Sequence, residues 1–369
     1  MLQRLARYRF YSAVTARLPV LSLLTGLLLM GPLVVAADQA EDQEFAVFIL
    51  AGQSNMVGHG KPEMGRNPDY DDADKSTQKE VPNGIGSLRW YVAQHPERLG
   101  PQGETPLLNA DGTWIERDDV AVHFVYERGV EHGMLTPHFG KGKWFGPEFG
   151  FGHVVGNALD EPVLIIKTAW GGHSLGVEFR PPSAGQPDYQ QTKVDPERVG
   201  ISYRAMIESV HQVLADKDTL FPHLAGKKPR LVGFGWHQGW NDGGSVEMVT
   251  EYESNMRHLI ADLRRDLEAP ELRIVIANSG MIGINATGRR ADLCEIQMGM
   301  ADPQRHPDLA GGVAAVETRP FKRSNEQSPS GFGFHWNHNA ESHWLVGEAM
   351  GKAMLGQETG PEEPAADEF

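Results

Sequence analysis

Five short apolar runs, rich in β-branched and aromatic residues, alternate along the chain with segments of helical periodicity. The runs span residues 45–50, 163–168, 231–236, 272–277 and 312–317. The predicted helices span residues 147–159, 203–214, 249–267 and 340–355. Apolar strands that alternate with helices are typical of a parallel sheet covered on both faces. The pattern predicts one three-layer αβα domain of the flavodoxin-like α/β class, with about five mainly parallel strands.

Residues 60–146 do not follow this alternation. They are rich in Gly, Pro, Asp and aromatic residues and show no strong period. Long irregular segments inside compact domains usually serve function. We expect these residues to form a long insertion on the side of the domain where substrate binds, with a small hairpin near residues 119–126.

The N-terminus has the pattern of a secretory signal. Four arginines precede the apolar run 18–35, and small residues follow at Ala36 and Ala37. This order of charged, apolar and small residues predicts a signal peptide over residues 1–37 and a secreted or periplasmic protein. A retained membrane anchor is the alternative, because the run approaches spanning length. Cleavage is favoured by Gly31-Pro32 within the apolar run and by Ala36-Ala37 at its end. After cleavage we expect no stable membrane partner.

Composition restricts the rest of the chain. The full sequence has a net charge of −15, and loss of the arginines in the signal makes it more acidic, which argues against nucleic-acid binding. Cys294 is the only cysteine, so a disulfide within the chain is excluded. We expect one catalytic domain over residues 38–356 and a disordered acidic tail over residues 357–369.

Ser54 is the most informative single residue. The buried run 45–50 ends at Gly52, and Ser54 follows where a helix is expected to begin. The free amides and the dipole at a helix N-terminus stabilise negative charge, which suits a nucleophile whose reaction forms an oxyanion. The alternative is that Ser54 only caps the helix.

Other predicted strands end in similarly unusual residues. The second run is followed by Trp170, Gly172 and His173, and the third by His237, Gln238, Trp240, Asn241 and Asp242. His335 and His338 precede the last predicted helix. Ligands of open parallel sheets bind beyond the carboxyl ends of the strands, so these residues are expected to form one site.

Four segments carry a resemblance to a known group of enzymes. They are Gly52-Gln-Ser-Asn-Met56, Lys167-Thr-Ala-Trp-Gly-Gly172, Trp236-His-Gln-Gly-Trp-Asn-Asp242 and the region of His335. From Phe45 to Leu355 the chain resembles the SGNH-hydrolase superfamily, and within it the sialate O-acetylesterase-like carbohydrate esterases.

The resemblance implies a serine esterase mechanism. Ser54 attacks an acetyl carbonyl, and His335 takes the serine proton and returns it to the leaving sugar oxygen. The Ser54 and Gly172 amides hold the oxyanion, together with the side-chain amide of Gln238 or Asn241; the position of Gln238 in its block favours Gln238.

The chain departs from the family pattern at two places. Trp240 stands where the third block usually has Glu, and Phe332 stands where the acid three residues before the histidine is expected. We take Asp242 as the catalytic acid. Glu317, Glu341, or a Ser-His dyad steadied by a backbone carbonyl remain open alternatives.

The resemblance and the strand ends also suggest substrate contacts. The candidate substrate-binding residues are Gln53, Asn55, Trp170, His237, Trp240 and His338. Trp144, Trp170, Trp240 and Trp336 offer stacking faces for a sugar ring or belong to the core. Only one of His335 and His338 is expected to reach Ser54. Asn339 is a plausible helix cap, so His338 is expected to face substrate or solvent.

The sequence also contains two rival candidate sites. The nucleophile elbow of α/β-hydrolases is matched by Gly172-His-Ser-Leu-Gly176. An elbow requires a helix directly after it, and Pro181-Pro182 are incompatible with a helix there. Ser174 is therefore expected in the wall of the site. His335, His338 and His343, with His237 near them in space, allow a zinc site, but the serine motif explains the site without metal.

We therefore expect an esterase that hydrolyses O-acetyl esters on carbohydrates and needs neither a cofactor nor a metal. The alternatives are a peptidase-like, lipase-like or other short-chain ester hydrolase with the same catalytic residues, and a catalytically weak or silent carbohydrate-binding protein on an esterase fold.

Overall fold

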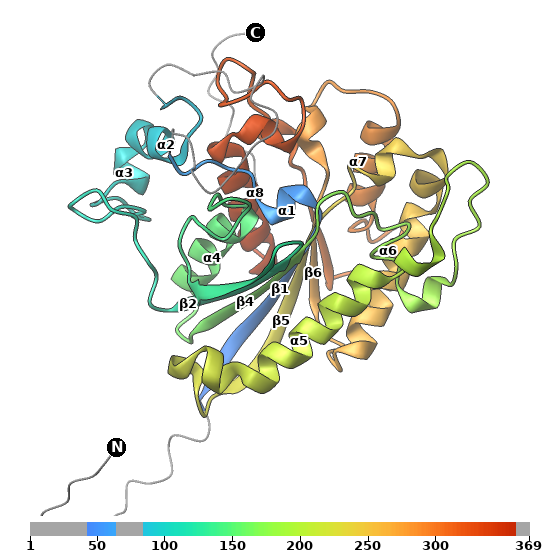
Figure 1. The fold of residues 1–369 in the computed structure, drawn as a ribbon, viewed down its shortest axis with the longest axis horizontal. Coiled ribbons are helices and arrows are strands. Elements are labelled where there is room, and N and C mark those ends of the chain that lie inside the picture. The colour runs from blue at the N-terminus through green and yellow to red at the C-terminus, as the bar shows by residue number, and fades with distance from the viewer. Residues whose placement is uncertain (1–42, 64–83, 359–369) are drawn as a thin grey trace, which may run out of the picture. The chain divides into compact units, whose positions relative to one another are not determined.

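A single seven-stranded sheet forms the centre of the protein (Figure 1). The structure is a computed structural model that describes residues 43–63 and 84–358. The strands are β1 (Glu44–Gly52), β2 (Val120–Tyr126), β3 (Gly129–Met134), β4 (Val163–Ala169), β5 (Lys228–His237), β6 (Arg273–Ala277) and β7 (Val313–Val316). The predicted signal peptide and nearly all of the predicted acidic tail lie outside the described residues, so both stay predictions.

The order of the strands confirms the predicted class. Across the sheet it is β3-β2-β4-β1-β5-β6-β7, and every pairing is parallel except that of β2 with β3. The five predicted runs became β1, β4, β5, β6 and β7. Their spatial order, β4-β1-β5-β6-β7, is the 2-1-3-4-5 winding of flavodoxin-like folds.

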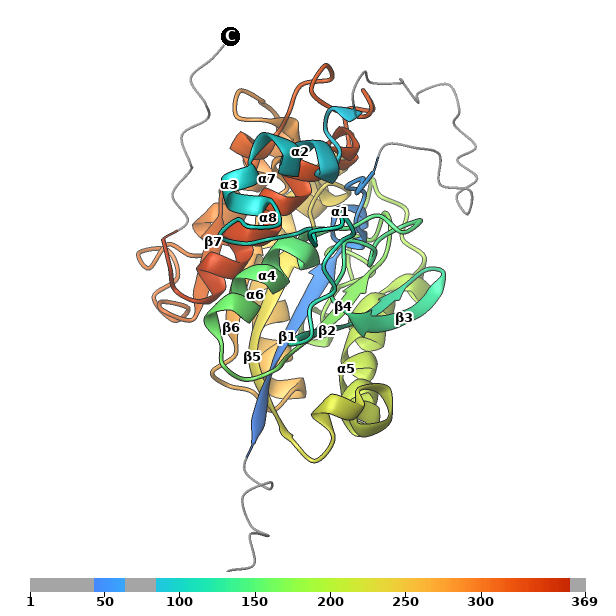
Figure 2. The ribbon, with the colours of Figure 1, turned by 90° about the vertical axis from the view of Figure 1, so that its left-hand side faces the viewer.

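The sheet is larger than predicted because the hairpin near residues 119–126 joins it. This hairpin is β2 with β3, and β2 pairs in parallel with β4, with Val120 opposite Val163. In Figure 2, β3 lies at the edge beside β2. The side chains of β3 are partly or fully exposed, so its sequence lacks the apolar run that marks the other strands.

Helices cover both faces. They are α1 (Ser54–Val57), α2 (Leu88–Gln94), α3 (Pro96–Leu99), α4 (Pro147–Ala158), α5 (Ile201–Leu220), α6 (Val246–Asp266), α7 (Arg289–Gly299) and α8 (Ala340–Met354). The four predicted helices are α4, α5, α6 and α8. Figure 1 shows α4 and α8 on one side of the sheet and α5 on the other. Among the described helices, none is long and apolar enough to cross a membrane.

β1 separates two hydrophobic cores. Ala46, Phe48 and Leu50 pack into the core that holds apolar residues of α4 and α8. The intervening Val47 and Ile49 pack into the core that holds apolar residues of α5 and α6. Because successive side chains of a strand point to opposite faces, a strand buried on both faces is apolar throughout.

One buried ion pair joins the sheet to the helices beside it. Lys167 of β4 and Glu148 of α4 are both fully buried, and Lys167 Nζ lies 2.6 Å from Glu148 Oε2. Nζ also donates to the carbonyl oxygens of Val57 (2.9 Å) and Phe139 (2.6 Å), and the Gly146 amide donates to Glu148 (2.9 Å). Burial raises the pKa of Glu148 and lowers that of Lys167, and their mutual attraction opposes both shifts. Since Val57 ends α1, the pair fixes the helix that begins with Ser54.

We expect Lys167→Met to lower the free energy of unfolding by about 3–5 kcal/mol, because it leaves Glu148 buried without its partner. The double variant Lys167→Met/Glu148→Gln should be more stable than Lys167→Met alone, since it removes the uncompensated charge. Urea unfolding of the three proteins checks this. Equal stability of the single and double variants would contradict it.

Candidate active site

The carboxyl ends of the central strands meet at one edge, as predicted. Gly52 at the end of β1 is opposite Ala169 of β4 and His237 of β5. The segments that follow these three strands therefore start side by side. In Figure 1, α1 lies directly beyond the end of β1.

Gly52 is required where β1 approaches β5. A Cβ atom at Gly52 would lie 2.1 Å from the carbonyl oxygen of His237. Only glycine allows the two strand ends to come this close. The turn to α1 is thus placed directly against the loop after β5.

Ser54 is the first residue of α1 and the only residue of the run 51–60 with a partly exposed side chain. The first amides of a helix have no acceptor within the helix, so the N-terminus of α1 presents free donors beside the Ser54 hydroxyl. The helix is one turn long, and its position depends on contacts from outside. Ser54 therefore combines access to substrate with an electropositive backbone setting.

Gln53 ties this turn to the loop after β5. Its Oε1 accepts hydrogen bonds from the backbone amides of Gly239 and Asn241, both at 3.2 Å, and from Gln238 Nε2 at 3.4 Å. The side chain is buried. These contacts show a structural task for Gln53, and its predicted contact with substrate stays a prediction.

Asp242 lies at the centre of a second buried network. Its carboxylate accepts from the amides of Leu175 (3.1 Å) and Gly176 (2.9 Å) and from Gln238 Nε2. Burial raises the pKa of Asp242 to about 6, against the effect of these hydrogen bonds. Gln238 Nε2 also donates to the carbonyl of His173 (3.1 Å). Both protons of the Gln238 amide thus have acceptors within the protein.

The candidate acids are engaged with different partners. Asp242 fixes Gln238 and the 175–176 turn. Glu317 accepts from Asn278 Nδ2 (2.8 Å) and pairs with Arg319, and Glu341 accepts from Arg323 Nη2 (2.6 Å). The role of Asp242 as the catalytic acid stays a prediction, and the structure gives its carboxylate a positioning task.

The remaining candidate residues differ in exposure. Gly172 is exposed, has φ +74°, and has open space around the position of a Cβ. Asn241 is exposed, whereas Trp170 and Trp240 are half-buried. The Arg290 guanidinium covers the Trp240 ring at 3.9 Å from its centroid. An exposed Gly172 amide and an exposed Asn241 side chain are the accessible donors among these candidates.

Asn55 and His237 are buried. Asn55 Nδ2 contacts Met281 Sδ at 3.2 Å, and His237 Nδ1 lies 3.2 Å from the carbonyl oxygen of Ala277. Burial lowers the pKa of His237 to about 4. Both side chains have structural contacts within the protein, and their predicted contacts with substrate stay predictions.

Ser174 does not lie on a nucleophile elbow. No helix follows it within residues 170–181, as the paired prolines predicted. Its buried hydroxyl donates to Glu178 Oε2 (2.8 Å) and accepts from the Val177 amide (3.0 Å). Ser174 stabilises the loop after β4.

The candidate histidines lie on a turn with unusual backbone geometry. From His335 to His338 every residue is left-handed, with φ between 52° and 61°. This conformation costs about 1–2 kcal/mol per non-glycine residue, and such strain concentrates at functional sites. Asn337 stabilises the turn: its Oδ1 accepts from the Gly333 amide (2.9 Å), and its carbonyl accepts from the Ser330 amide (3.0 Å).

The turn leads into α8 through the predicted cap. Asn339 Oδ1 accepts from the Ser342 amide at 3.1 Å, which confirms the cap. The turn, η9 (His335–His338), also packs against α1. This contact brings the segment of His335 beside the segment of Ser54.

Three imidazoles gather where η9 meets the end of α1. His59 and His335 are stacked with ring centroids 3.8 Å apart, and His338 lies 5.7 Å from His59 and 6.2 Å from His335. His338 is 4% exposed, so it does not face solvent as one alternative predicted. The left-handed turn brings His335 and His338 into one cluster with His59. That only one of the two reaches Ser54 stays a prediction.

Sequence reasoning missed His59. It lies five residues after Ser54, in the same run that carries the nucleophile motif. This short separation in sequence could have predicted that His59 lies near Ser54, because α1 is too short to lead the chain away from the site.

Burial keeps these histidines neutral. It lowers the pKa of His335 to about 4, that of His338 to about 3, and that of His59 well below its usual value. The positive charge of Lys141 adds to each shift. Each ring therefore has one nitrogen with a free lone pair at neutral pH, as a general base requires.

The family model of carbohydrate esterases described as sialic acid-specific acetylesterases (SASA) matches residues 44–355. The chain belongs to this family. It is therefore a carboxylic ester hydrolase. No curated protein matches the chain.

Three solved structures are similar to the chain to different degrees. A protein from Arabidopsis thaliana has a TM-score of 0.52 and 17% identity, over 85% of this chain and 98% of that chain. A carbohydrate acetylesterase from Xanthomonas citri has a TM-score of 0.45 and 13% identity, over 84% of this chain and 57% of that one. The protein NanS has a TM-score of 0.40 and 11% identity, over 77% of this chain and 79% of its own. The first of these supports the three-layer fold.

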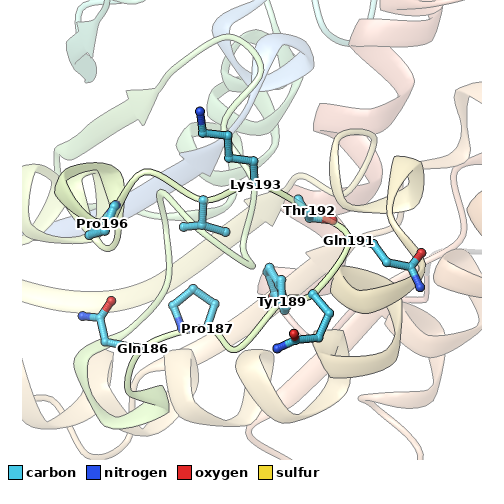
Figure 3. A pocket seen from close by; sticks show the side chains of 9 residues that line it. Gln186, Pro187, Tyr189, Gln191, Thr192, Lys193 and Pro196 are labelled. Carbon is cyan, nitrogen blue, oxygen red and sulfur yellow. The ribbon is translucent and has the colours of Figure 1, made fainter.

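A separate hollow lies outside the candidate active site. The hollow encloses about 350 Å³ and is lined by nine residues that all belong to the segment 186–196 (Figure 3). This segment is anchored on α6, where the Gln191 and Thr192 amides donate to Glu247 (3.0 and 2.9 Å). Because one loop forms the hollow, the strand ends that carry the candidate catalytic residues do not line it.

Proposed function

We propose that this SASA esterase removes O-acetyl groups from carbohydrates outside the cytoplasm, with Ser54 as nucleophile and His335 as general base. The observation that supports the proposal is the packing of η9, which carries His335, against α1, which begins with the partly exposed Ser54. An acidic protein of this family suits a neutral, acetylated glycan better than a polyanion.

The proposed reaction has two halves. Ser54 Oγ attacks the acetyl carbonyl, and His335 accepts the hydroxyl proton. The tetrahedral intermediate collapses, the sugar oxygen leaves with that proton, and an acetyl-serine remains. Water, activated by the same histidine, then attacks the acetyl-serine and releases acetate.

The amides of Ser54 and Gly172 are the proposed backbone donors to the oxyanion. For the side-chain donor, the geometry favours Asn241 over Gln238. The Gln238 amide protons already bind Asp242 and the His173 carbonyl, whereas the Asn241 side chain is exposed. We infer that Asp242 and Gln238 hold the loop that presents Asn241.

We expect Ser54→Ala and His335→Ala each to lower turnover of a small acetyl ester by at least about 10³-fold, because members of one catalytic unit fail together. His338→Ala should mainly raise KM. The measurement is steady-state kinetics on the small ester, followed by acetate release from acetylated xylan and from O-acetylated sialic acid.

Ser174→Ala is the matched control, since Ser174 is a nearby buried serine that the mechanism does not use. It should keep kcat within a few-fold of the wild type, with folding checked by circular dichroism. An inactive His338→Ala beside an active His335→Ala would move the base to His338. Absence of acetate release by the folded wild type from every ester would favour the silent carbohydrate-binding alternative.

The pH profile tests the base independently. A general base works only when neutral, and burial together with Lys141 lowers the pKa of His335 to about 4. We therefore expect kcat/KM to stay high down to about pH 5 and to fall as the pH drops through that pKa. A fall of kcat/KM centred near pH 6 that is absent in Asp242→Asn would show that the Asp242 carboxyl controls the acidic side of the profile, and would contradict the prediction.

The pattern of residues 1–37 supports the proposed export. We expect the exported protein to begin at Ala37 or Asp38, because signal peptidase reads small residues before the cleaved bond. N-terminal sequencing of the exported protein checks this. A protein that keeps residues 1–36 in the membrane fraction would support the anchor instead.

A further inference from the structure

The cluster of His59, His335 and His338 contains more imidazoles than the proposed esterase chemistry uses. One general base is enough, and His335 fills that role. His59 and His338 are 3% and 4% exposed, and within the described residues their Nδ1 atoms have no hydrogen-bond partner. A buried polar atom without a partner costs about 1–3 kcal/mol. The left-handed turn that brings His335 and His338 together costs more still.

The three imidazoles offer donor atoms that are close enough together to become ligands of one metal ion. Each of the three rings offers a nitrogen, and these nitrogens lie within 4.8 Å of one another. Neutral imidazole is a preferred ligand of Zn²⁺, Cu²⁺ and Ni²⁺, and three histidines leave a fourth position of zinc open. The positive charges of Lys61 and Lys141 act on His338 and oppose a cation, so affinity depends on the imidazole lone pairs.

Coordination requires a limited rearrangement. Zinc–nitrogen bonds of about 2.0–2.1 Å place the nitrogens of a tetrahedral site about 3.4 Å apart, whereas here they lie within 4.8 Å of one another. The stacked rings of His59 and His335 must also turn from their 13° alignment, because a metal lies in the plane of each imidazole. His335 is half-buried, whereas the other two rings are buried, so it has the most room to rotate.

We propose that His59, His335 and His338 bind one divalent transition-metal ion, for which Zn²⁺ is the probe, and that binding switches the esterase off. The second half rests on the proposed function. A neutral imidazole has one lone pair. If zinc takes the lone pair of His335, the other ring nitrogen carries the hydrogen, and no nitrogen is left to accept the Ser54 proton.

This set of ligands differs from the one that the sequence suggests. The sequence groups His343 with His335 and His338, whereas the structure groups His59 with them. His343 is fully buried next to the cluster. It packs against Gly60, because a Cβ atom added to Gly60 would lie 3.1 Å from the Cβ of His343. It is therefore a neighbouring buried histidine outside the three ligands, and it serves as a matched control.

The binding test uses the full chain without a polyhistidine tag, washed free of metal. Calorimetry with Zn²⁺ should give one equivalent bound. His59→Phe and His338→Phe keep an aromatic ring and remove a ligand. Each should weaken zinc binding more than about 100-fold, which exceeds the usual loss when a residue that only contacts a ligand is changed. His343→Gln should bind zinc within a few-fold of the wild type. Thermal unfolding confirms that each variant is folded.

A spectroscopic readout keeps the test independent of activity. Co²⁺ in place of zinc should give the visible absorption of a tetrahedral site in the wild type, and His59→Phe should lose it. Absence of zinc binding by the wild type, or equal affinity in wild type, His59→Phe and His338→Phe, would overturn the site.

The inhibition test then follows turnover of a small acetyl ester. Zn²⁺ should abolish wild-type turnover, EDTA should restore it, and His59→Phe should need a zinc concentration higher by the same factor as its loss of affinity. Zinc bound at the three histidines with turnover unchanged would overturn the switch. If the metal-free wild type has no turnover, the proposed function fails, while calorimetry still decides the site.

Discussion

The buried pair of Lys167 and Glu148 is the interaction on which the geometry of the site depends. α1 has four residues, too few to form a stable helix without support from the rest of the protein. Its C-terminal carbonyl is held by Lys167, and Lys167 is held in turn by Glu148 of α4. The pair therefore transmits the positions of β4 and α4 to the segment that carries Ser54. Replacing it with apolar residues could preserve stability but would release the end of α1.

The N-terminal side of α1 is fixed by hydrogen bonds of a different kind. Gln53 accepts from the loop after β5, and Asp242 in that loop accepts from the turn after β4. Three strand ends are thus connected through buried acceptors on two side chains. Because both side chains accept several hydrogen bonds from protein donors, they hold the three strand ends together. In the proposed mechanism, the substrate meets the partly exposed Ser54 and the exposed Gly172 and Asn241.

The turn from His335 to His338 is the strained part of the site. A right-handed turn would direct its two histidines differently, and a glycine-rich turn could not place them in a fixed cluster. Asn337 and the Asn339 cap compensate part of the strain with hydrogen bonds. The result is a cluster of three neutral imidazoles, in which we propose both the base of the esterase and the ligands of a metal ion.

The sequence by itself determined the αβα class, the 2-1-3-4-5 winding, the place of Ser54 after β1 and the cap at Asn339. These features depend on local patterns: apolar runs, helical periodicity and the chemistry of a single turn. The tertiary structure alone decided that β2 and β3 extend the sheet, that Asp242 holds Gln238, and that His59 joins His335 and His338. Those outcomes depend on the register between distant strands and on a left-handed backbone that no local propensity favours, so only the packed fold could bring the residues together.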